Sequence, residues 1–552
     1  MSGPTLFSAL ERAALTQKHI RVLEEADRSL AIPYSVLHGE ALAIGGALAA
    51  RGLAPGSRVA LVVPDVADFI RAFFGIVAAG LVPVPLFPPA QAGDLPTFTR
   101  QSRHILDASR ASAVLTCGDL APLVAGNDVL PAATVLTIDE LRHGPPLGRA
   151  VVVGSDAIAL IQFTSGSTAA PKGVMLTHAN IEANTAAIRR TLKLGPDDIG
   201  VSWLPLYHDM GLIGMLMTAV FEAATVVMTS PIQFLKRPTI WLDAISKYGG
   251  TVSFAPNFAY ALCLRRVKPS QIAGLDLSSW RVAGCGAEPI RAETLRAFAD
   301  RFETAGFSRS SFVPSYGLAE HSLAVTFATA GLRVDVVDTA VLGRESRAVP
   351  VVNGSPSVTV VNCGRPVAHH DVRIVDDEDR ELPERHVGRI VARGPSVMAG
   401  YFENPEATAE ALRDGWLQTG DLGYVAGGEL FVCGRTKDLI IRHGRKYHPP
   451  DLESAIADVQ GMRSSGVVVF GISRYDETDT VVAVLEARGS SAGDDIAEHV
   501  RRRVRETAGL EIDQVIVTPP GTIPRTTSGK VRRAETRARF EAGTLLDSGR
   551  GL

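Results

Sequence analysis

The stretch that decides the fold runs from Phe163 to Gly173 and reads FTSGSTAAPKG. It continues an apolar run, Ala157–Phe163, that is typical of a buried β-strand. Small hydroxyl residues and glycines let backbone N–H groups approach phosphate oxygens, and Lys172 adds a positive charge. We therefore expect a phosphate-binding loop after a strand. Its candidate residues are Thr164, Ser165, Gly166, Ser167, Thr168 and Lys172.

The same stretch does not fit the loop of P-loop NTPases, which requires G-x-x-x-x-G-K-[ST]. Pro171 stands five residues after Gly166, and Gly173 follows Lys172 where a Ser or Thr would bind Mg²⁺. P-loop kinases and ATPases are therefore disfavoured. A flexible Ser/Gly turn remains an alternative for this loop taken alone.

Length and composition indicate a multidomain globular protein. The 552 residues exceed the size at which one hydrophobic core stops growing, about 250–300 residues, so at least two domains are expected. Apolar residues make up 46% of the chain and charged residues 21%, which is typical of soluble proteins. A formal net charge of −3 gives no overall field that would attract nucleic acid or an anionic membrane, and we expect neither as a partner.

No feature of the sequence indicates export or a membrane span. Glu11 and Arg12 stand where a signal peptide would have its apolar run, so we expect a cytoplasmic protein. Charges or prolines interrupt the two long apolar stretches, Phe69–Ala90 and Gly211–Met228, which we interpret as buried helices and strands. The five cysteines lie far apart without a C-x-x-C pair, which fits reduced core thiols.

The pattern along the chain predicts three kinds of structure. From about residue 36 to 366, helical and β-rich segments alternate, for example the helix expected over Asp65–Ala79, which predicts parallel sheets covered by helices. After about Leu382, short strands separated by glycine predict a small β-rich subdomain. The final residues, about 115 of them, are enough for a separable unit. Residues 331–362 hold β-branched runs with no helical period and resemble an insertion.

Five further motifs follow the loop in sequence. They are Gly286-Ala287-Glu288, Ser315-Tyr316-Gly317-Leu318-Ala319-Glu320, Thr419-Gly420-Asp421, Gly434-Arg435-Thr436-Lys437-Asp438 and the stretch PRTTSGK that ends at Lys530. Taken singly, each is more typical of a turn, a surface acid or a basic tail. Together, and in this order, they resemble the motifs of the adenylate-forming superfamily, which includes acyl-CoA synthetases, peptide-synthetase adenylation domains and luciferases. The resemblance covers about residues 30–535.

The resemblance implies a fold and a set of cofactors. The expected α/β fold has a large N-terminal domain, residues 1–434, built of two α/β sheet subdomains and a small β-rich subdomain, with the probable insertion at 331–362. A small, mobile α+β C-terminal domain, residues 435–552, is expected to turn about a hinge near Lys437. ATP and Mg²⁺ are the implied cofactors.

The resemblance also implies roles for single residues. Tyr316 would stack on adenine, with Ser315, Gly317 and Leu318 in the same motif and Gly286, Ala287 and Glu288 lining the pocket. Asp421 and Arg435 would contact the ribose. Glu320 would hold Mg²⁺, for which a carboxylate is a suitable hard ligand.

The chemistry of adenylation explains why a lysine is expected at position 530. When a carboxylate attacks the α-phosphorus of ATP, negative charge develops on the acid, the α-phosphate and the leaving pyrophosphate, and a positioned ammonium stabilises it. A mobile, glycine-containing loop lets that group enter and leave. We predict that Lys530 is needed for adenylation and much less for the subsequent transfer.

The stretch WLPLYHDMGLIG, residues 203–214, indicates the class of acid. It contains the H-x-x-G pattern typical of acyl-chain activators, in which the histidine, here His208, borders the acid-binding pocket. The following run Gly211–Val220 is apolar with small residues and is suited to line a tunnel for an alkyl chain. A buried helix with a core histidine remains the alternative.

Several segments resemble the sequences of fatty acyl-AMP ligases. Two of these segments are LDLSSWRVAGCGAEPIRAETL and KDLIIRHGRKYHPPDLE. Those enzymes make an acyl-adenylate and pass the acyl group to the phosphopantetheine thiol of an acyl carrier protein instead of to coenzyme A. Residues 331–362 lie where that group carries an insertion thought to restrict the rotation needed for coenzyme A transfer. Residues 442–446 also differ from the Gly-Gly region usual in acyl-CoA synthetases. His321 follows Glu320 where Thr or Ala is more usual, and we assign it no role.

Three alternatives remain. The first is a fatty acyl-CoA synthetase of the same fold, and the second an activator of aryl or amino acids. The third is a nucleotide-binding scaffold without catalysis, which the intact Lys172, Glu320, Asp421, Arg435 and Lys530 argue against. The arginine-rich residues 501–505 could dock an acidic carrier, but a solvated helix face is the favoured explanation.

Overall fold

The computed structural model describes most of the chain. The described residues are 3–24, 28–88, 95–125, 135–164, 171–352, 355–457, 459, 462–473, 479–487, 493–525 and 531–545. The predicted site residues Ser165, Gly166, Ser167, Thr168 and Lys530 lie outside them.

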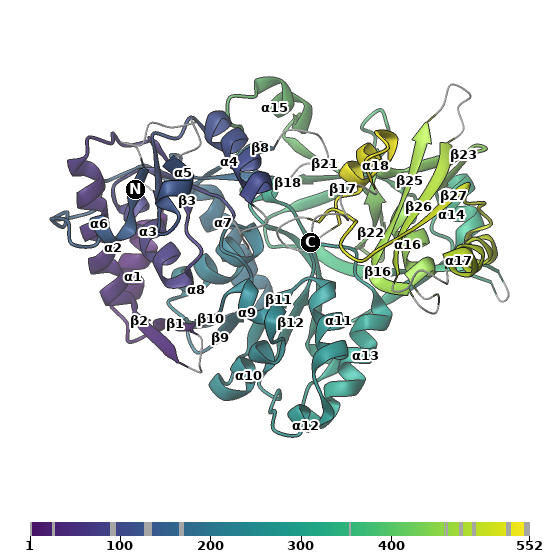
Figure 1. The fold of residues 1–552 in the computed structure, drawn as a ribbon, viewed down its shortest axis with the longest axis horizontal. Helices are drawn as coiled ribbons and strands as arrows, with labels where there is room; N and C mark the ends of the chain where they lie inside the picture. The colour runs from purple at the N-terminus through teal and green to yellow at the C-terminus, as the bar shows by residue number, and fades with distance from the viewer. Residues whose placement is uncertain are drawn as a thin grey trace.

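The centre of the N-terminal domain is a parallel sheet that extends into an antiparallel one (Figure 1). Its parallel part has the strand order β13-β12-β11-β9-β10-β1, and β2 pairs antiparallel with β1 at the edge. The bounds are β1 His19–Leu23, β2 Ser29–Pro33, β9 Ile199–Ser202, β10 Thr225–Met228, β11 Val252–Ala255, β12 Val282–Cys285 and β13 Phe312–Gly317. Strands β11 and β12 are buried along their whole length, which explains their continuous apolar sequence.

Helices and aromatic side chains cover this sheet. The helices include α7 His178–Leu192, α10 Thr239–Tyr248, α11 Asn257–Arg266 and α13 Ala292–Phe302. Trp241, Tyr260, Trp280 and Phe298 are each at most 1% exposed and pack edge to face or stacked at centroid distances of 5.0–6.4 Å. Such aromatic pairs add stability beyond the area that they bury. This core fixes the ends of β12 and β13, which carry the motifs Gly286–Glu288 and Ser315–Glu320.

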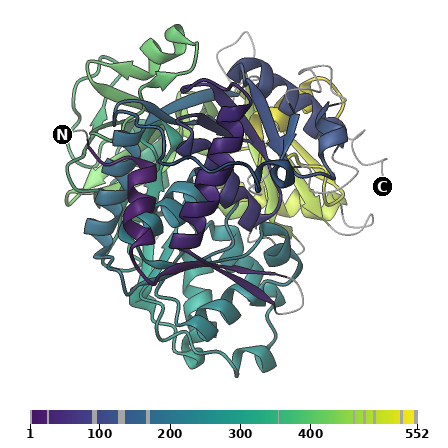
Figure 2. The same ribbon diagram turned by 90° about the vertical axis from the view of Figure 1, so that its left-hand side faces the viewer.

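A second α/β unit precedes the phosphate loop. Strands β3 Arg58–Val62, β4 Val82–Pro85, β5 Ala113–Thr116 and β6 Val135–Thr137 form a parallel sheet, and α2 Tyr34–Ala50 packs against α3 Val66–Ala78. The helix predicted over Asp65–Ala79 is confirmed, with Asp65 as its N-cap. Pro83 and Pro85 are tolerated because β4 is an edge strand of this sheet. Figure 2 shows the N-terminal helices of this side in purple, facing the viewer.

The two strands on either side of residues 165–171 belong to a three-stranded antiparallel sheet. β7 Ile158–Thr164 pairs with β8 Lys172–Thr177, so that Thr164 and Lys172 are ladder partners, and β19 Gly400–Tyr401 pairs with the other edge of β8. The strand predicted over Ala157–Phe163 is therefore confirmed.

The predicted β-rich subdomain is confirmed and is continuous with the central sheet. Its strands are β16 Ser357–Pro366, β17 Asp371–Val375, β18 Gly388–Arg393, β21 Trp416–Ala426 and β22 Glu429–Arg435. β14 Ala324–Phe327 joins the two parts, because it pairs with β13 on one side and β16 on the other.

The stretch 331–362 folds as a strand, a helix and the start of β16. β15 Val334–Asp338 pairs antiparallel with β16, and α14 Thr339–Glu345 follows it. The sequence pattern of this stretch gave no sign of the helix. Asp338 caps the helix by accepting hydrogen bonds from the N–H groups of Ala340 and Val341, and seven residues are too few for a periodic pattern.

The C-terminal part is a small α+β unit, drawn in yellow-green in Figure 1. Its sheet has the order β25-β26-β27, with β25 Met462–Ser473, β26 Asp479–Ala487 and β27 Gln514–Thr518. The helices are α16 Pro449–Ala457, α17 Gly493–Ala508 and α18 Arg533–Glu541, and β23 Ile440–Arg442 forms a hairpin with β24 Arg445–Tyr447. Lys446 Nζ lies 3.3 Å from Ser346 Oγ at the end of α14, so this hairpin contacts the 331–362 stretch. The boundary at 434/435 stays a prediction.

Two further expectations can be compared with the structure. All five cysteines are free thiols, and Cys263, Cys285, Cys363 and Cys433 are buried, as expected for core residues. Within the described residues, none of the helices combines the length and the apolar character that crossing a membrane requires.

Candidate active site

A cleft of about 2570 Å³ brings most of the predicted residues together. It lies between the N-terminal sheets and the C-terminal unit, and α16 and the residues next to α18 form part of its wall. The predicted residues that line it are Lys172, His208, Ala287, Glu288, Ser315, Tyr316, Gly317, Leu318, Glu320, Asp421, Arg435 and Lys437. Gly286 lies behind this wall against Ser315. The backbone of Thr164 ends β7 opposite Lys172.

Glu320 lines the cleft beside Tyr401. It belongs to a short 3-10 helix, Ala319–His321, directly after β13. The hydroxyl of Tyr401 donates a hydrogen bond of 2.9 Å to its Oε1, and Lys172 Nζ lies 4.9 Å from the centre of the Tyr401 ring. Burial raises the pKa of Glu320 because it penalises the charged carboxylate. Such a carboxylate fits a magnesium site, since Mg²⁺ is usually bound by one or two carboxylates together with substrate phosphates.

Tyr401 is a site residue that the sequence motifs did not reveal. It reaches the cleft because β19 pairs with β8, which sets Tyr401 opposite Val174, two residues from Lys172. Its position in the sequence, more than two hundred residues after the phosphate loop, gives no sign of this contact.

The Thr419-Gly420-Asp421 motif forms a β-bulge. Strands β18 and β21 change register between Arg389 and Val391, so the three residues 419–421 stand opposite Ile390 alone. Gly420 has φ +77°, in the region that favours glycine. A bulge of this kind re-aims a side chain, and here the side chain is that of Asp421.

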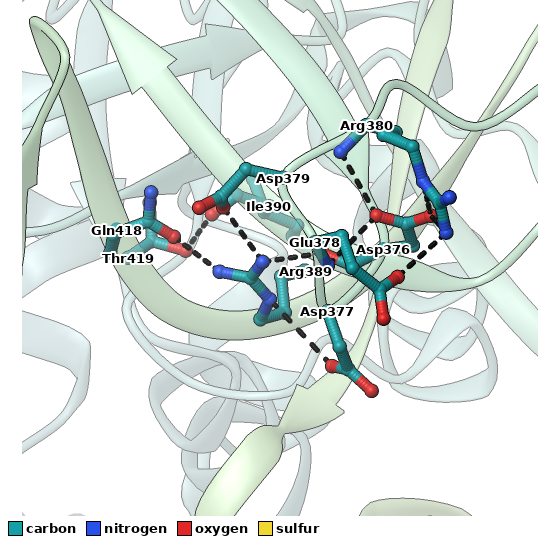
Figure 3. Close-up of polar contacts among 9 residues, drawn as sticks. All are labelled: Asp376, Asp377, Glu378, Asp379, Arg380, Arg389, Ile390, Gln418 and Thr419. Carbon is teal, nitrogen blue, oxygen red and sulfur yellow. Dashed lines mark hydrogen bonds and ion pairs between the residues drawn. The ribbon is translucent and has the colours of Figure 1, made fainter.

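Two anchors hold the bulge (Figure 3). Thr419 Oγ1 donates to the carbonyl oxygen of Ile390 at 2.7 Å, which satisfies a group that the bulge leaves unpaired. On the other side, Arg389 Nη1 donates to Gln418 Oε1 at 2.6 Å. The same guanidinium binds Asp379 Oδ1 at 2.7 Å and so ties the acidic turn between β17 and β18 to the base of the bulge.

Asp421 joins the motif to Tyr316 and Arg435. The Tyr316 hydroxyl donates to Asp421 Oδ2 at 2.6 Å, and Arg435 Nε lies 3.5 Å from Oδ1. Burial and the neighbouring carboxylate both raise the pKa of Tyr316, so it remains a donor. The three residues come from β21, β13 and β22, and Asp421 and Arg435 are ladder partners. The structure therefore brings together the residues for which the resemblance implied adenine and ribose contacts.

The segment Gly286-Ala287-Glu288 packs tightly behind this group. A Cβ on Gly286 would lie 2.5 Å from Ser315 Oγ, so a larger residue would displace the β13 motif. Ala287 has φ +69°, an unusual conformation for a residue with a side chain. Glu288 Oε1 accepts a 2.6 Å hydrogen bond from the N–H of Phe258 and so holds the start of α11. Glu288 thus has a structural contact in addition to its predicted place in the lining.

His208 lies at the mouth of an apolar part of the cleft. Its Nδ1 is 2.5 Å from Asp209 Oδ1, and the preceding carbonyl, of Tyr207, accepts from Gln162 Nε2 at 2.7 Å. The segment after it is helical, which was the alternative interpretation of this run. Its first part is a π-helix, Met210–Met217, and α8 Thr218–Glu222 is α-helical. π-Helical segments occur often at functional sites.

Lys437 lies in the short helix Thr436–Asp438, which leads into the C-terminal unit. Asp438 pairs with Arg533 of α18, and Arg533 also binds both oxygens of Glu453 in α16, at 2.8 and 2.9 Å. The motifs pointed to neither Arg533 nor Glu453.

The residues on both sides of 526–530, the stretch that contains Lys530, bind each other. Arg525 and Val531 form a β-bridge, and the N–H of Arg532 donates to the carbonyl of Pro524 at 2.9 Å. The buried carboxylate of Glu486 accepts from the N–H groups of Gly521 and Ile523 at 2.9 and 3.0 Å. These anchors place the base of the loop at the wall of the cleft, because Arg525, Val531 and Arg532 line it.

Comparison with known proteins agrees with this site. Residues 10–402 match the family described as AMP-binding enzyme. A protein of Caulobacter vibrioides, named provisionally as an acyl-CoA synthetase, is 38% identical over 99% of this chain and 96% of its own. JamA of Moorena producens, a medium-chain fatty acid–[acyl-carrier-protein] ligase, is 34% identical over 88% of this chain and 86% of its own.

A solved structure is similar over the whole length. It comes from a study of fatty acyl-adenylate ligases of E. coli and L. pneumophila, with a TM-score of 0.92 and 37% identity over 98% of both chains. Members of the family use ATP, as a rule with Mg²⁺, and the residues around the cleft fit both. The chain belongs to the AMP-binding, adenylate-forming enzyme family and, within it, to the fatty acyl-AMP ligases.

Proposed function

We propose that this chain joins a fatty acid to AMP, releases pyrophosphate, and then passes the acyl group to the phosphopantetheine thiol of an acyl carrier protein. The first step is supported by the position of two sets of residues in one cleft. Tyr316, Asp421 and Arg435 offer contacts for a nucleoside, while Glu320 and Lys172 lie at the side where phosphates would extend. An apolar pocket beside His208 completes the site.

The adenylation step follows from these groups. One carboxylate oxygen of the fatty acid attacks the α-phosphorus of ATP, the bond between that phosphorus and the bridging oxygen breaks, and pyrophosphate leaves with the electron pair. Lys172 and the 164–172 loop hold the leaving phosphates, and Lys530 stabilises the charge on the attacked phosphate. Glu320 offers the carboxylate ligand for Mg²⁺, which when bound neutralises part of the phosphate charge.

The apolar part of the cleft supports a fatty acid as the substrate. Met210 and Gly214 of the π-helix, Phe254, Phe258 and Leu323 line the cleft together with His208. Such a wall suits an alkyl chain, while His208 and Lys172, which line the same cleft, suit its carboxylate. Asp209 orients the His208 ring through Nδ1.

Two observations support a carrier protein as the acceptor. JamA, which is similar over most of its length, is named as a ligase that uses an acyl carrier protein. The hairpin β23–β24 of the C-terminal unit contacts α14 of the 331–362 stretch, through Lys446 and Ser346. Such a contact would limit the turn of the C-terminal domain about Lys437 and disfavour coenzyme A as the acceptor.

Exchange of labelled pyrophosphate into ATP tests the first step. Fatty acids of graded length should support exchange, aryl and amino acids should not, and Lys530→Ala should abolish it. Arg537→Ala provides the control, because Arg537 is an exposed cation of α18 paired only with Glu541. Undiminished exchange in the Lys530 variant would overturn its role, and no exchange with any acid would favour the silent scaffold.

The acceptor is tested separately. The enzyme is incubated with ATP, decanoate and either coenzyme A or a holo acyl carrier protein, and thioester formation is followed by mass spectrometry. Rapid formation of decanoyl-CoA would instead favour an acyl-CoA synthetase, the second candidate, which the name of the Caulobacter vibrioides relative supports. Lys530→Ala should still transfer the acyl group from supplied acyl-AMP.

A further inference from the structure

The turn that carries Glu320 is held in a strained conformation. Ser322 has φ +62° and ψ −57°, and the N–H of Leu323 donates to the carbonyl of His321 at 2.7 Å. Together these define a γ-turn with positive φ, which is rare and strained. The N–H of Leu318 also donates to the carbonyl of Leu323 at 2.9 Å, which closes the turn on itself. Strain of this kind persists only where surrounding contacts over-determine it.

Asn184 of α7 supplies the main surrounding contact. Its side chain is fully buried, at 0% exposure. Nδ2 donates to the carbonyls of Ala324 and His321, at 3.0 and 3.2 Å, and Oδ1 accepts from the N–H of Ala324 at 3.0 Å. The amide thus pairs with both backbone groups of Ala324, as a neighbouring strand would, and its orientation is fixed by three bonds.

His321 supports the same residue from within the turn. Its Nδ1 donates to the carbonyl of Ala324 at 2.9 Å, and its ring packs against His370, with 4.9 Å between the ring centroids. Because His321 is fully buried, the position after Glu320 requires a side chain that fits this space and can donate a hydrogen bond.

The β-rich subdomain holds the other side of the turn. Ser322 Oγ donates to the carbonyl of Ser396 at 2.7 Å, and Ser396 Oγ lies 2.6 Å from Nε2 of His370. The N–H of Met398 donates to the carbonyl of Glu320 itself at 2.9 Å. The turn is therefore held by α7 on one side and by the 396–398 segment on the other.

We propose that Asn184 is a positioning residue for Glu320: it keeps the turn 317–324 in the conformation that points the Glu320 carboxylate into the cleft. Without the amide, the buried N–H of Ala324 loses this acceptor. The carbonyls of Ala324 and His321 then keep only the bonds from His321 Nδ1 and from the N–H of Leu323, which favours relaxation of the γ-turn. Relaxation would move Glu320 away from Tyr401. The inference deepens the proposed function, because it rests on the role of Glu320 as the magnesium ligand.

Asn184→Ala tests the proposal, and Thr185→Ala is its matched control. Thr185 is the next residue of α7 and equally buried, but its hydroxyl donates to the carbonyl oxygen of Glu182 in its own helix, at 3.0 Å. Calorimetric titration with a non-hydrolysable ATP analogue, with and without Mg²⁺, gives the gain in affinity that Mg²⁺ provides. We expect Asn184→Ala to reduce this gain about 10-fold, the usual effect of losing an outer-shell partner, and Thr185→Ala to change it less than about 2-fold.

Hydrogen exchange supplies a readout that needs no nucleotide. The amides of Leu318 and Leu323 should exchange at least about 10-fold faster in Asn184→Ala and unchanged in Thr185→Ala, since about 1.4 kcal/mol of lost protection corresponds to tenfold. Ser396→Ala removes only the bond to His370 and should produce a smaller change in the same direction. The Ser396→Ala variant keeps the proposal testable if Asn184→Ala does not fold.

Glu320→Gln separates the two hypotheses. If Glu320→Gln loses the magnesium-dependent gain in affinity while Asn184→Ala or Ser396→Ala keeps it, the positioning role of Asn184 is overturned. The role of Glu320 as the magnesium ligand then stands. If Glu320→Gln keeps the gain, the metal role of Glu320 in the proposed function is overturned, and the inference with it. If Glu320→Gln and Asn184→Ala both lose the magnesium-dependent gain, and the amides of the turn exchange faster in Asn184→Ala, the proposal is supported.

Discussion

Replacing Arg533 by methionine should loosen the C-terminal unit. The Arg533 side chain is 18% exposed and binds three residues. It binds both oxygens of Glu453, pairs with Asp438 beside the predicted hinge, and donates from Nε to the carbonyl of Val469 at 3.1 Å. Methionine fills a similar volume without charge, so the effect reports the loss of the ion pairs.

The expected loss follows from what remains behind. Asp438 and Glu453 are only 14% and 12% exposed, and without the guanidinium they would be two carboxylates in a partly buried site. Removing one partner of such a buried network typically costs about 3–5 kcal/mol. At about 1.4 kcal/mol per factor of ten, the opening equilibrium of this unit should rise by at least about 100-fold.

Native-state hydrogen exchange measures this locally. Amides of β25 and β26 should lose protection, while those of β11 and β12 in the N-terminal core should not change. Arg537→Met is the control, because the Arg537–Glu541 pair is exposed and should be worth less than about 1 kcal/mol. A loss below about 1 kcal/mol in Arg533→Met would show that the network does not hold α16 and α18 together and would refute the reasoning.

Three other changes have outcomes that the structure defines. Gly317→Ala would set a Cβ 2.1 Å from a backbone oxygen of the same turn, so pyrophosphate exchange should be almost abolished, whereas Gly39→Ala, with nothing within 4 Å, should retain it. Arg389→Ala removes the anchor of the Thr419–Asp421 bulge and should raise the KM for ATP about 10-fold with little change in the KM for fatty acid, and Arg380→Ala in the same acidic turn should have no such effect. Burial lowers the pKa of His178 to about 4, so an unfolded histidine takes up a proton near pH 6.5 while the folded one does not. The free energy of unfolding should therefore fall between pH 6.5 and 4, by up to about 1.4 kcal/mol per pH unit from this residue, and urea denaturation of His178→Gln should show a shallower decrease.

The sequence revealed those site residues whose expected role depends on the kind of side chain that they carry. Gly286, Tyr316, Asp421 and Arg435 were predicted from short motifs, and the structure places them together because their strands belong to one continuous sheet. Three of the residues lie at the ends of β12, β13 and β22, and Asp421 lies at the bulge inside β21. The motifs could not show how Asp421 is presented. The bulge depends on Ile390, about thirty residues earlier, so its register is a property of two strands and not of the tripeptide.

Residues that act through distant partners escaped prediction for the same reason. His321 stood beside a predicted ligand and still had no assignable role, because Asn184 and His370 lie far from it in the sequence. Tyr401 and Arg533 likewise became visible only through pairing and helix packing. The helix α14 was missed because its start depends on one capping side chain, Asp338, and it is too short for periodicity.

Strand β16 has a consequence for any attempt to shorten this protein. Its first half, Ser357–Val361, pairs with β15, and its second half lies between β14 and β22. Deleting β15 and α14 would expose a β-branched edge with unpaired N–H and C=O groups, which is a template for association between chains. A shortened protein could thus lose activity by self-association, and its oligomeric state has to be measured before any change in acceptor preference is attributed to the missing segment.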